Sequence, residues 1–466
     1  MTSRPATLGQ LRDSGWVSVP IKEEVRRNAA AAIAAGRPVV EGVVGYDDTV
    51  LPQIEHAVLA GHDIIFLGER GQAKTRMIRG LTGLLDEWLP IVGGSEILDD
   101  PYAPVSRYAR DLTAERGDDT PVEWVHRDTR FGEKLATPDT SIADLIGEVD
   151  PIKVAEGRYL SDELTMHYGL VPRTNRGIFA INELPDLAER IQVGLLNVLE
   201  ERDVQVRGYK IRLPLDVMLV ASANPEDYTN RGRIITPLKD RFGAQIRTHY
   251  PLDVATEIEV VHQEAVTFEV EGVTVNVPDY MTEIVATLSQ LARQSPHVNQ
   301  RSGVSVRLSV ANYETLVASA ARRSLRLGET DASPRISDLD ALAASTSGKI
   351  EIETIEEGRD SQVIERLVSQ AVLAVFRSRV QMDQVRDALE SFDTGSVVHA
   401  GDDVASDRLV QVLTDIPALR EPVIGLAGSE SPAAVASAVE LILEGLHLTK
   451  RLNKDAAGTR STYRAR

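Results

Sequence analysis

Short, continuously apolar runs alternate with amphipathic segments through the first half of the chain. The clearest runs are 62–67 (HDIIFL), 177–181 (GIFAI) and 217–222 (VMLVAS). Continuous apolar runs of this length are typical of strands in a parallel sheet that helices cover on both faces. Helix-like stretches over 75–88 and 187–201 lie between these runs. The pattern therefore predicts an α/β fold with a doubly wound parallel sheet.

The second half of the chain, after about residue 250, shows helical periodicity instead. The segments with this periodicity are 280–293, 309–326, 361–380, 403–413 and 433–446. They predict an α-helical lid followed by a helical C-terminal region. The parts that we expect along the chain are a helical lead-in (1–39), an α/β core (40–250), a helical lid (251–357), a helical C-terminal region (358–449) and a flexible basic tail (450–466).

Two segments interrupt the pattern of the core. Residues 93–137 are rich in Asp, Pro and Arg and lack clean periodicity, so they are expected to form an insertion. Residues 203–214 alternate between apolar and polar positions around a glycine, which predicts a β-hairpin.

The charge of the chain is unevenly distributed. The whole chain holds 51 Lys and Arg against 70 Asp and Glu, a formal net charge of −19. This balance disfavours broad attraction to DNA or to anionic membranes. The tail has the opposite sign, since it holds one acid, Asp455, against the bases Lys450, Arg451, Lys454, Arg460, Arg464 and Arg466. A solvated, flexible extension is the simpler interpretation of this tail, and contact with an acidic partner is the alternative.

The composition excludes several kinds of site. The chain holds no cysteine, so disulfides, thiolate metal sites and cysteine nucleophiles are excluded. No apolar stretch of signal-peptide kind opens the chain, and no run approaches the roughly 18 apolar residues that a membrane helix needs. We therefore expect a soluble, cytoplasmic protein without a membrane span, for which nucleic acid is a disfavoured partner.

The sharpest local motif is GERGQAKT at residues 68–75, which follows an apolar run and precedes a helix-like stretch. Phosphate-binding loops have the pattern G-x-x-x-x-G-K-[ST] in this context. The backbone amides of such a loop bind phosphate, Lys74 would reach the β- and γ-phosphates, and the Thr75 hydroxyl would bind Mg²⁺. A glycine turn with an exposed Lys74 is the structural alternative, and Ala73 departs from the glycine of the generic pattern. The expected nucleotide-binding residues are Gly68, Glu69, Arg70, Gly71, Gln72, Ala73, Lys74 and Thr75.

Polar residues follow the other two apolar runs and are candidates for catalysis. Glu183 can orient or activate an attacking water, and Asn224 can sense the γ-phosphate. Asn182 is a candidate partner of Mg²⁺ or its bound water, but an amide contributes no negative charge, which predicts weakened hydrolysis. Arg241 can enter a neighbouring subunit's site and stabilise transition-state charge. Taken singly, Asn224 is equally a turn residue and Arg241 equally a surface cation; their order along the chain favours a nucleotide site.

This ordered set of motifs resembles that of the AAA+ ATPases, and within them the branch of magnesium chelatase subunit I and the MoxR-like proteins. The resemblance covers roughly residues 40–330. Besides the phosphate loop, the runs that carry it are EGVVGYDDTV, TSIADLIGEVDPIKVAEG, LVPRTNRGIFAINELPDL, NVLEERDVQVRGYKIRLP, SANPEDY and LKDRFG.

The resemblance implies a P-loop NTPase core with an α-helical lid, and an ATPase that uses ATP and Mg²⁺. It assigns Glu183 as the catalytic carboxylate, Asn224 as sensor one and Arg241 as the finger that acts in a neighbouring subunit. Arg307 is the candidate for sensor two, with Arg301 as its competitor, and surface cations are the alternative for both. The resemblance also implies a homo-oligomeric ring, often hexameric, and a chelatase-type partner protein that carries a von Willebrand A-type domain.

Several functions are compatible with these features. The first is a motor or chaperone that hydrolyses ATP to remodel a partner protein. The second is a nucleotide-gated scaffold or regulator with little or no hydrolysis, because Asn182 stands where the family has Asp. A sigma-factor-dependent transcriptional activator would need a GAFTGA-like loop and a helix-turn-helix module, and the sequence shows neither. Metal insertion into a porphyrin is not supported, since that site would lie on another subunit.

Overall fold

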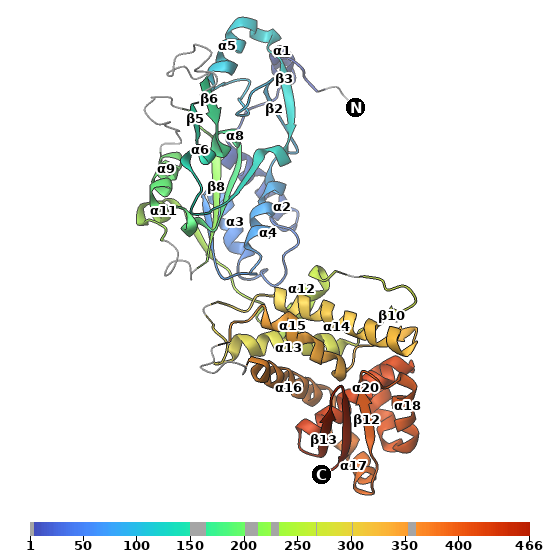
Figure 1. Ribbon diagram of the computed structural model, residues 1–466. Helices are drawn as coiled ribbons and strands as arrows, with labels where there is room; N and C mark the ends of the chain where they lie inside the picture. Colours follow the sequence, from blue (N-terminus) through green and yellow to red (C-terminus); the bar gives the residue numbers. More distant parts are fainter. Residues whose placement is uncertain are drawn as a thin grey trace. The chain divides into compact units, whose positions relative to one another are not determined.

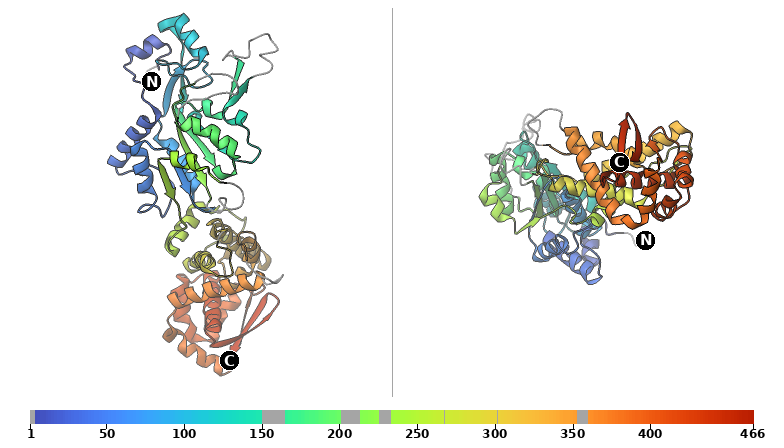
Figure 2. Two further views of the ribbon diagram at one scale, coloured as in Figure 1. Left: turned by 90° about the vertical axis from the view of Figure 1, so that its left-hand side faces the viewer. Right: turned by 90° about the horizontal axis from the view of Figure 1, so that it is seen from below.

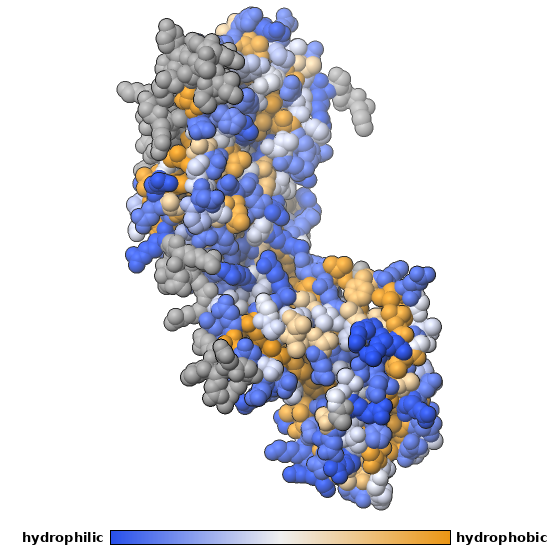
Figure 3. All heavy atoms as spheres, viewed as in Figure 1, coloured by the Kyte–Doolittle hydropathy of each residue, from blue (hydrophilic) through white to orange (hydrophobic). Residues whose placement is uncertain are grey.

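The computed structural model describes residues 4–149, 165–200, 213–224, 233–266, 268–300, 302–352 and 360–466. The chain divides into two compact units, Met1–His249 and Tyr250–Arg466 (Figure 1). Over both units, the face shown in Figure 3 mixes hydrophilic and hydrophobic residues.

A five-stranded parallel sheet forms the centre of the first unit. Its strand order is β4-β7-β8-β1-β9, and each neighbouring pair is parallel. The strands are β1 (Ile64–Leu67), β4 (Phe131–Leu135), β7 (Gly177–Asn182), β8 (Val217–Ala223) and β9 (Ala244–Arg247). The three strands predicted from continuous apolar runs, β1, β7 and β8, lie side by side in the middle of this sheet.

Helices cover both faces of the sheet, as the two layers in Figure 2 show. Successive residues of a strand point to opposite faces, and β1 illustrates the result. Ile64 and Phe66 belong to one apolar cluster, together with residues of α2 (Ile21–Ala34), α3 (Leu51–Ala60) and α4 (Lys74–Gly80). Ile65 and Leu67 belong to another, together with residues of α9 (Glu189–Glu200) and α11 (Thr236–Arg241). This arrangement confirms the predicted doubly wound P-loop NTPase sheet.

A buried ion pair holds α2 against the sheet. Arg130 and Glu24 are 0% and 2% exposed, and both guanidinium nitrogens donate to the carboxylate, at 2.6 and 2.8 Å. Arg130 also donates to the carbonyl of Arg176, just before β7. Removing one member of such a pair would leave the other charged and buried, so the two side chains act as one structural element.

The segment expected to be an insertion, 93–137, is only partly one, and this part of the prediction was wrong. Its last residues form β4, a strand of the central sheet. The run FGEKL carries charges at Glu133 and Lys134, so it is not continuously apolar and was not predicted to be a strand. Because β4 pairs with a single neighbour, β7, it is an edge strand, and its residues are half-buried or exposed.

The described part of the first unit also holds two antiparallel strand pairs. β2 (Trp88–Val92) pairs antiparallel with β3 (Val122–His126), and β5 (Gly147–Val149) pairs with β6 (Met166–Tyr168). The predicted helix over 75–88 is shorter than expected, since α4 ends at Gly80 and β2 begins at Trp88. The predicted hairpin at 203–214 lies outside the described residues except for its last two positions. Further elements are α1 (Leu8–Asp13), η1 (Leu81–Leu84), α5 (Arg107–Arg116), η2 (Gly117–Asp119), η3 (Arg127–Arg130), α6 (Ile142–Leu145), α8 (Leu170–Arg173) and η5 (Leu184–Asp186).

The second unit is mainly helical, in agreement with the predicted lid and C-terminal region. One apolar cluster extends through it, from Tyr280 to Tyr463. Its elements up to 352 are α12 (Val254–Glu264), β10 (Thr274–Val275), α13 (Asp279–Gln294), α14 (Arg307–Leu327), β11 (Asp331–Ala332), η6 (Ile336–Ala341) and α15 (Leu342–Ser347). Those from 360 onward are α16 (Asp360–Arg379), η7 (Met382–Val385), α17 (Arg386–Asp393), β12 (Val398–Gly401), α18 (Ser406–Asp415), η8 (Pro417–Leu419), α19 (Arg420–Ala427), α20 (Pro432–Leu448), β13 (Leu452–Ala457) and β14 (Arg460–Ala465).

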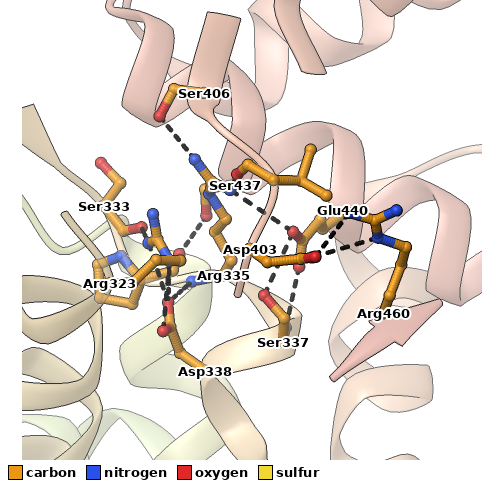
Figure 4. Close-up of polar contacts among 12 residues, drawn as sticks. Arg323, Ser333, Arg335, Ser337, Asp338, Asp403, Ser406, Ser437, Glu440 and Arg460 are labelled. Carbon is orange, nitrogen blue, oxygen red and sulfur yellow. Dashed lines mark hydrogen bonds and ion pairs between the residues drawn. The ribbon is translucent and has the colours of Figure 1, made fainter. Parts of the chain in front are cut away.

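A buried ionic network ties the two halves of the second unit together (Figure 4). Arg323 on α14 donates to Asp338 at 3.0 Å, and Arg335 donates to Ser406 on α18 at 2.6 Å. Glu440 on α20 accepts from the backbone amide of Ser337. Burial raises the pKa of Glu440, and the charge of Arg335 opposes that shift. The lid and the C-terminal region therefore share one apolar cluster and one buried network of polar contacts.

Among the described residues, no single helix has the length and apolar character to cross a membrane. The helical segments Pro417–Ala427 and Pro432–Leu448, which meet at 111°, have that length and composition only when taken together.

The basic tail is ordered, and its predicted flexibility was wrong. β13 and β14 form a hairpin, and β14 also pairs with β12 in a three-stranded antiparallel sheet. Leu452 and Tyr463 are each 2% exposed and join the apolar cluster of the unit. Three of the basic side chains form ion pairs, which are Lys454–Glu444, Arg460–Asp403 and Arg464–Asp455. Two apolar anchors in a polar stretch gave too weak a periodicity to predict this hairpin.

The packed hairpin predicts a large effect at Tyr463. Tyr463→Ala removes a buried ring and its hydrogen bond to Glu444, and we expect it to lower the free energy of unfolding by about 3 kcal/mol. Urea denaturation measures this loss. The neighbouring variant Arg464→Ala, at an exposed ion pair, is the control and should cost less than about 1 kcal/mol. Equal stabilities for wild type and Tyr463→Ala would contradict the packed hairpin.

Candidate functional site

The loop between β1 and α4 requires small residues at two points. A Cβ added at Gly68 would overlap Thr248 Oγ1 and Gln72 Oε1, so this position admits only glycine. Ala73 has φ 54° and ψ 14°, in the left-handed region that glycine adopts without strain. Ala73 thus occupies the conformation for which the generic loop uses glycine, at a cost that the surrounding packing offsets.

Hydrogen bonds from three directions hold the loop. Gln72, 6% exposed, accepts at Oε1 from the Glu69 amide at 3.0 Å and from the Thr248 hydroxyl at 2.6 Å. The Tyr46 hydroxyl donates to the carbonyls of Gln72 and His249, at 3.0 and 2.7 Å. Burial raises the pKa of Tyr46 well above its usual range, so this hydroxyl stays protonated. The loop is therefore a turn that hydrogen bonds to surrounding residues hold in place.

Lys74 points into this loop rather than into solvent. Its side chain is 7% exposed, and Nζ donates to the carbonyl of Gly68 and to that of Glu69, the latter at 2.7 Å. The alternative of a glycine turn with an exposed Lys74 is therefore wrong. A buried ammonium group surrounded by loop backbone suits an anionic ligand with several oxygens.

A cavity of about 390 Å³ adjoins the loop. It is lined by residues 67–69, Gln72, Lys239, Arg247 and Thr248. Its size falls in the range of small-molecule sites, which is roughly 300–1,000 Å³. Lys239 and Arg247 add positive charge to a wall that the phosphate loop already forms. These observations fit a phosphate-bearing ligand and agree with the chemistry expected from the loop.

The carboxyl end of β7 carries the predicted catalytic pair. Asn182 is 8% exposed; its Oδ1 accepts from the Ser222 hydroxyl at 3.1 Å, and its Nδ2 donates to Glu133 at 2.6 Å. Glu183 has φ 55° and ψ 48°, a second left-handed residue that is not glycine. Its amide donates to Ser222 Oγ at 3.3 Å. Left-handed strain of this kind occurs at functional sites, where surrounding contacts enforce it.

The remaining predicted residues are distributed over both units. Asn224 directly follows β8 and is 1% exposed, and Arg241 ends α11 with a side chain that is 42% exposed. Thr75 is exposed on the first turn of α4. Arg307 begins α14 in the second unit and is exposed, so its role as sensor two stays a prediction. Arg301 lies outside the described residues.

The parallel register explains why the loop after β1, Glu183 after β7 and Asn224 after β8 lie at one edge of the sheet. The carboxyl ends of adjacent parallel strands lie together, and backbone hydrogen bonds continue past them: Gly68 donates to Ala223 at 3.1 Å and Ala136 donates to Asn182 at 2.8 Å. In the part of the chain that the structure describes, no three His, Asp or Glu side chains gather as a metal site. Mg²⁺ in nucleotide sites is bound by one or two protein ligands together with phosphates, so Thr75 and Asn182 are compatible with it.

Sequence reasoning missed several residues of this site. They are Tyr46, Arg79, Glu133, Ser222, Lys239, Arg247 and Thr248. Tyr46 lies in the run EGVVGYDDTV, which carried the resemblance without an assigned role. Ser222 and Lys239 likewise lie in the runs SANPEDY and LKDRFG, without an assigned role. The others are single polar residues, and only the fold brings them to this site.

A comparison with protein families finds a match in the C-terminal part of the first unit. Residues 155–241 match the sequence profile of the sigma-54 interaction domain, which is an AAA+ domain. This match covers about a fifth of the chain and includes β7 and β8. Together with the strand order and the phosphate loop, this match supports a fold of the AAA+ P-loop NTPase type. No curated protein matches the sequence.

Solved structures with a similar arrangement include three from different proteins. A structure of the complex between subunits BchI and BchD of magnesium chelatase has 22% identity and a TM-score of 0.36, covering 70% of this chain and 100% of that one. A putative ATPase from Cytophaga hutchinsonii has 16% identity and a TM-score of 0.31, covering 75% and 95%. NtrX from Brucella abortus in complex with ATP has 14% identity and a TM-score of 0.41, covering 77% and 67%. These scores are low, and the fold assignment rests on the strand order and the loop instead.

The bracing of the loop predicts an effect of Thr248 on nucleotide affinity. Thr248→Val keeps the shape but removes the hydroxyl that donates to Gln72, a hydrogen bond worth about 1 kcal/mol. We expect the dissociation constant for ATP to rise roughly fivefold, measured by calorimetry. Thr248→Ser keeps the hydroxyl and is the matched control. An unchanged affinity in Thr248→Val would show that Gln72 does not need this donor.

Proposed function

We propose that this protein binds ATP with Mg²⁺ and hydrolyses it, acting as an AAA+ motor or chaperone on a partner protein. The observation that carries the proposal is the enclosure of Lys74 by the loop carbonyls of Gly68 and Glu69, beside a cavity that can take a nucleotide. A lysine in this position can exchange carbonyl oxygens for phosphate oxygens without a change of fold.

The loop binds the phosphates of the nucleotide. The amides of residues 68–75 and the Lys74 ammonium hold the phosphates, and Thr75 and Asn182 hold Mg²⁺ or its water. Bound Mg²⁺ would neutralise charge that develops on the phosphate oxygens during transfer. Lys239 and Arg247, which also line the cavity, are further cations that can attract the anionic ligand.

The residues that follow β7 and β8 carry out the hydrolysis. Glu183 accepts a proton from, or orients, the attacking water, and the left-handed backbone at this residue fixes where the side chain leaves the strand. Asn224 lies at the end of the adjacent strand, where an amide can hold the same water or contact the γ-phosphate. In this proposal the proton acceptor, Glu183, follows β7, and the residue that holds the water or contacts the γ-phosphate, Asn224, follows β8.

A homo-oligomeric ring follows from the proposed role of Arg241. Its side chain is 42% exposed at the end of a short helix, which suits a cation that completes the site of a neighbouring subunit. Arg307 would act as sensor two from the lid. A partner with a von Willebrand A-type domain, and placement in the branch of magnesium chelatase subunit I and MoxR-like proteins, are supported by the motifs quoted from the sequence.

The alternative function is a nucleotide-gated scaffold with little or no hydrolysis, which Asn182 motivates. The match to the sigma-54 interaction domain does not by itself extend the proposal to transcription, because the sequence shows no GAFTGA-like loop. The motor is preferred over the scaffold, since the structure supplies a carboxylate, Glu133, in contact with Asn182.

Replacing the catalytic carboxylate separates motor from scaffold. Glu183→Gln should lower kcat for ATP by at least about a hundredfold while the dissociation constant for ATP changes little, because the change removes a proton acceptor and leaves the loop intact. Steady-state phosphate release and calorimetry measure the two quantities. Glu189→Gln, an exposed carboxylate on α9, is the matched control. Absent wild-type turnover would contradict the motor and favour the scaffold, whereas wild-type turnover that Glu183→Gln leaves unchanged would contradict the role of Glu183.

A further inference from the structure

The residue that departs from the family's pattern, Asn182, has a carboxylate beside it on the neighbouring strand. Glu133 on β4 accepts from Asn182 Nδ2 at 2.6 Å. The same carboxylate accepts from Arg79 on α4, at 2.8 Å from Nε and 3.2 Å from Nη2. The side chain of Glu133 is 21% exposed, so these contacts take place at the partly solvated edge of the sheet.

The position of Glu133 explains why residue 182 is an amide. An aspartate at 182 would place a second carboxylate within hydrogen-bond distance of Glu133, and two carboxylates so close cannot both stay ionised without a large cost. An amide donates to Glu133 and removes that conflict. This chain therefore has a carboxylate beside residue 182, on the neighbouring strand, where Arg79 pairs with it.

The contacts also fix which way the amide points. A carboxylate can only accept, so Glu133 selects the NH₂ side of Asn182, and the Ser222 hydroxyl occupies one lone pair of Oδ1. Oδ1 is thereby turned toward β8, and Ser222 in turn contacts the amide of Glu183. The chain of contacts runs from Arg79 through Glu133, Asn182 and Ser222 to the backbone amide of Glu183.

We propose that Glu133 and Asn182 form a transposed carboxylate–amide pair, in which Glu133 is a positioning residue that supplies the negative charge of the magnesium shell and orients Asn182. This inference rests on the proposed ATP hydrolysis. Arg79 links the pair to α4, the helix that begins with Lys74 and Thr75. The ion pair of Arg79 and Glu133 thus connects the helix that follows the phosphate loop with the edge of the sheet proposed to position the attacking water.

The test exchanges the carboxylate of residue 133 and the amide of residue 182 between the two positions. In Asn182→Asp, two carboxylates face each other, and in Glu133→Gln the charge is lost; we expect each single variant to lower kcat at least tenfold with the KM for ATP nearly unchanged. The double variant Glu133→Gln/Asn182→Asp restores one carboxylate and one amide in exchanged places. It should recover kcat to within about threefold of wild type. Thermal unfolding of all four proteins without nucleotide shows whether each variant folds.

The outcomes separate the pair from a purely structural ion pair. A structural role for Glu133 predicts losses that add in the double variant, and additive losses would overturn the proposal. Higher turnover in Asn182→Asp alone would also overturn it, since the family's aspartate would then be missing rather than transposed. Arg79→Gln, which weakens the link to α4 but keeps the pair, should lower kcat less than either single variant.

The same variants keep the inference testable if hydrolysis itself is absent. Wild-type protein without turnover would contradict the proposed motor. The pair is then tested through the Mg²⁺ dependence of binding of a non-hydrolysable ATP analogue. The single variants should require at least tenfold more Mg²⁺ for half-saturation, and the double variant should restore the wild-type value; an unchanged Mg²⁺ requirement in all variants would overturn the proposal.

Discussion

The chemistry of the first unit depends on the left-handed turn that carries the chain from β1 into α4. This turn needs a residue without side-chain bulk at Gly68 and a left-handed backbone at Ala73. Gln72, Thr248 and Tyr46 hold it from inside. Because these contacts are buried, the loop keeps its form while Lys74 stays inside it. The loop thus holds a buried ammonium group beside its backbone, an arrangement that suits a phosphate group.

The sheet brings the rest of the site to this turn. Parallel pairing places the ends of β1, β7 and β8 at one edge, so that Lys74, Glu183 and Asn224 follow three adjacent strands. The pair of Glu24 and Arg130 then fixes α2 against the segment before β4. The same edge strand carries Glu133, and its ionic contact with Arg79 connects it to α4. The packing of the first unit and the proposed catalysis therefore use the same few elements.

The sequence was sufficient for the features that depend on local pattern. Continuous apolar runs predicted β1, β7 and β8, and the spacing within GERGQAKT predicted the loop. It was insufficient where a residue's role depends on a distant neighbour. Glu133 belongs to a half-exposed edge strand with no apolar signal, and its meaning appears only when β4 pairs with β7. In the sequence, Asn182 indicated that the site lacks the carboxylate of an aspartate. The structure shows the carboxylate of Glu133 beside Asn182, on the neighbouring strand. Tyr463 anchors a hairpin that composition alone describes as a basic tail.

Net charge is a poor guide to this site for a related reason. The chain has a formal charge of −19, yet the loop and cavity collect Lys74, Lys239 and Arg247. Distant charges are screened within about 10 Å at ordinary ionic strength, so these local cations decide what binds. Calorimetric titration of wild type and Lys74→Ala with ATP and Mg²⁺ tests whether this loop is a nucleotide site. Saturable binding by wild type at a ratio of one ATP per chain, weakened at least a hundredfold in Lys74→Ala, is the expected result. Equal affinities in the two proteins, or no binding by wild type, would contradict it.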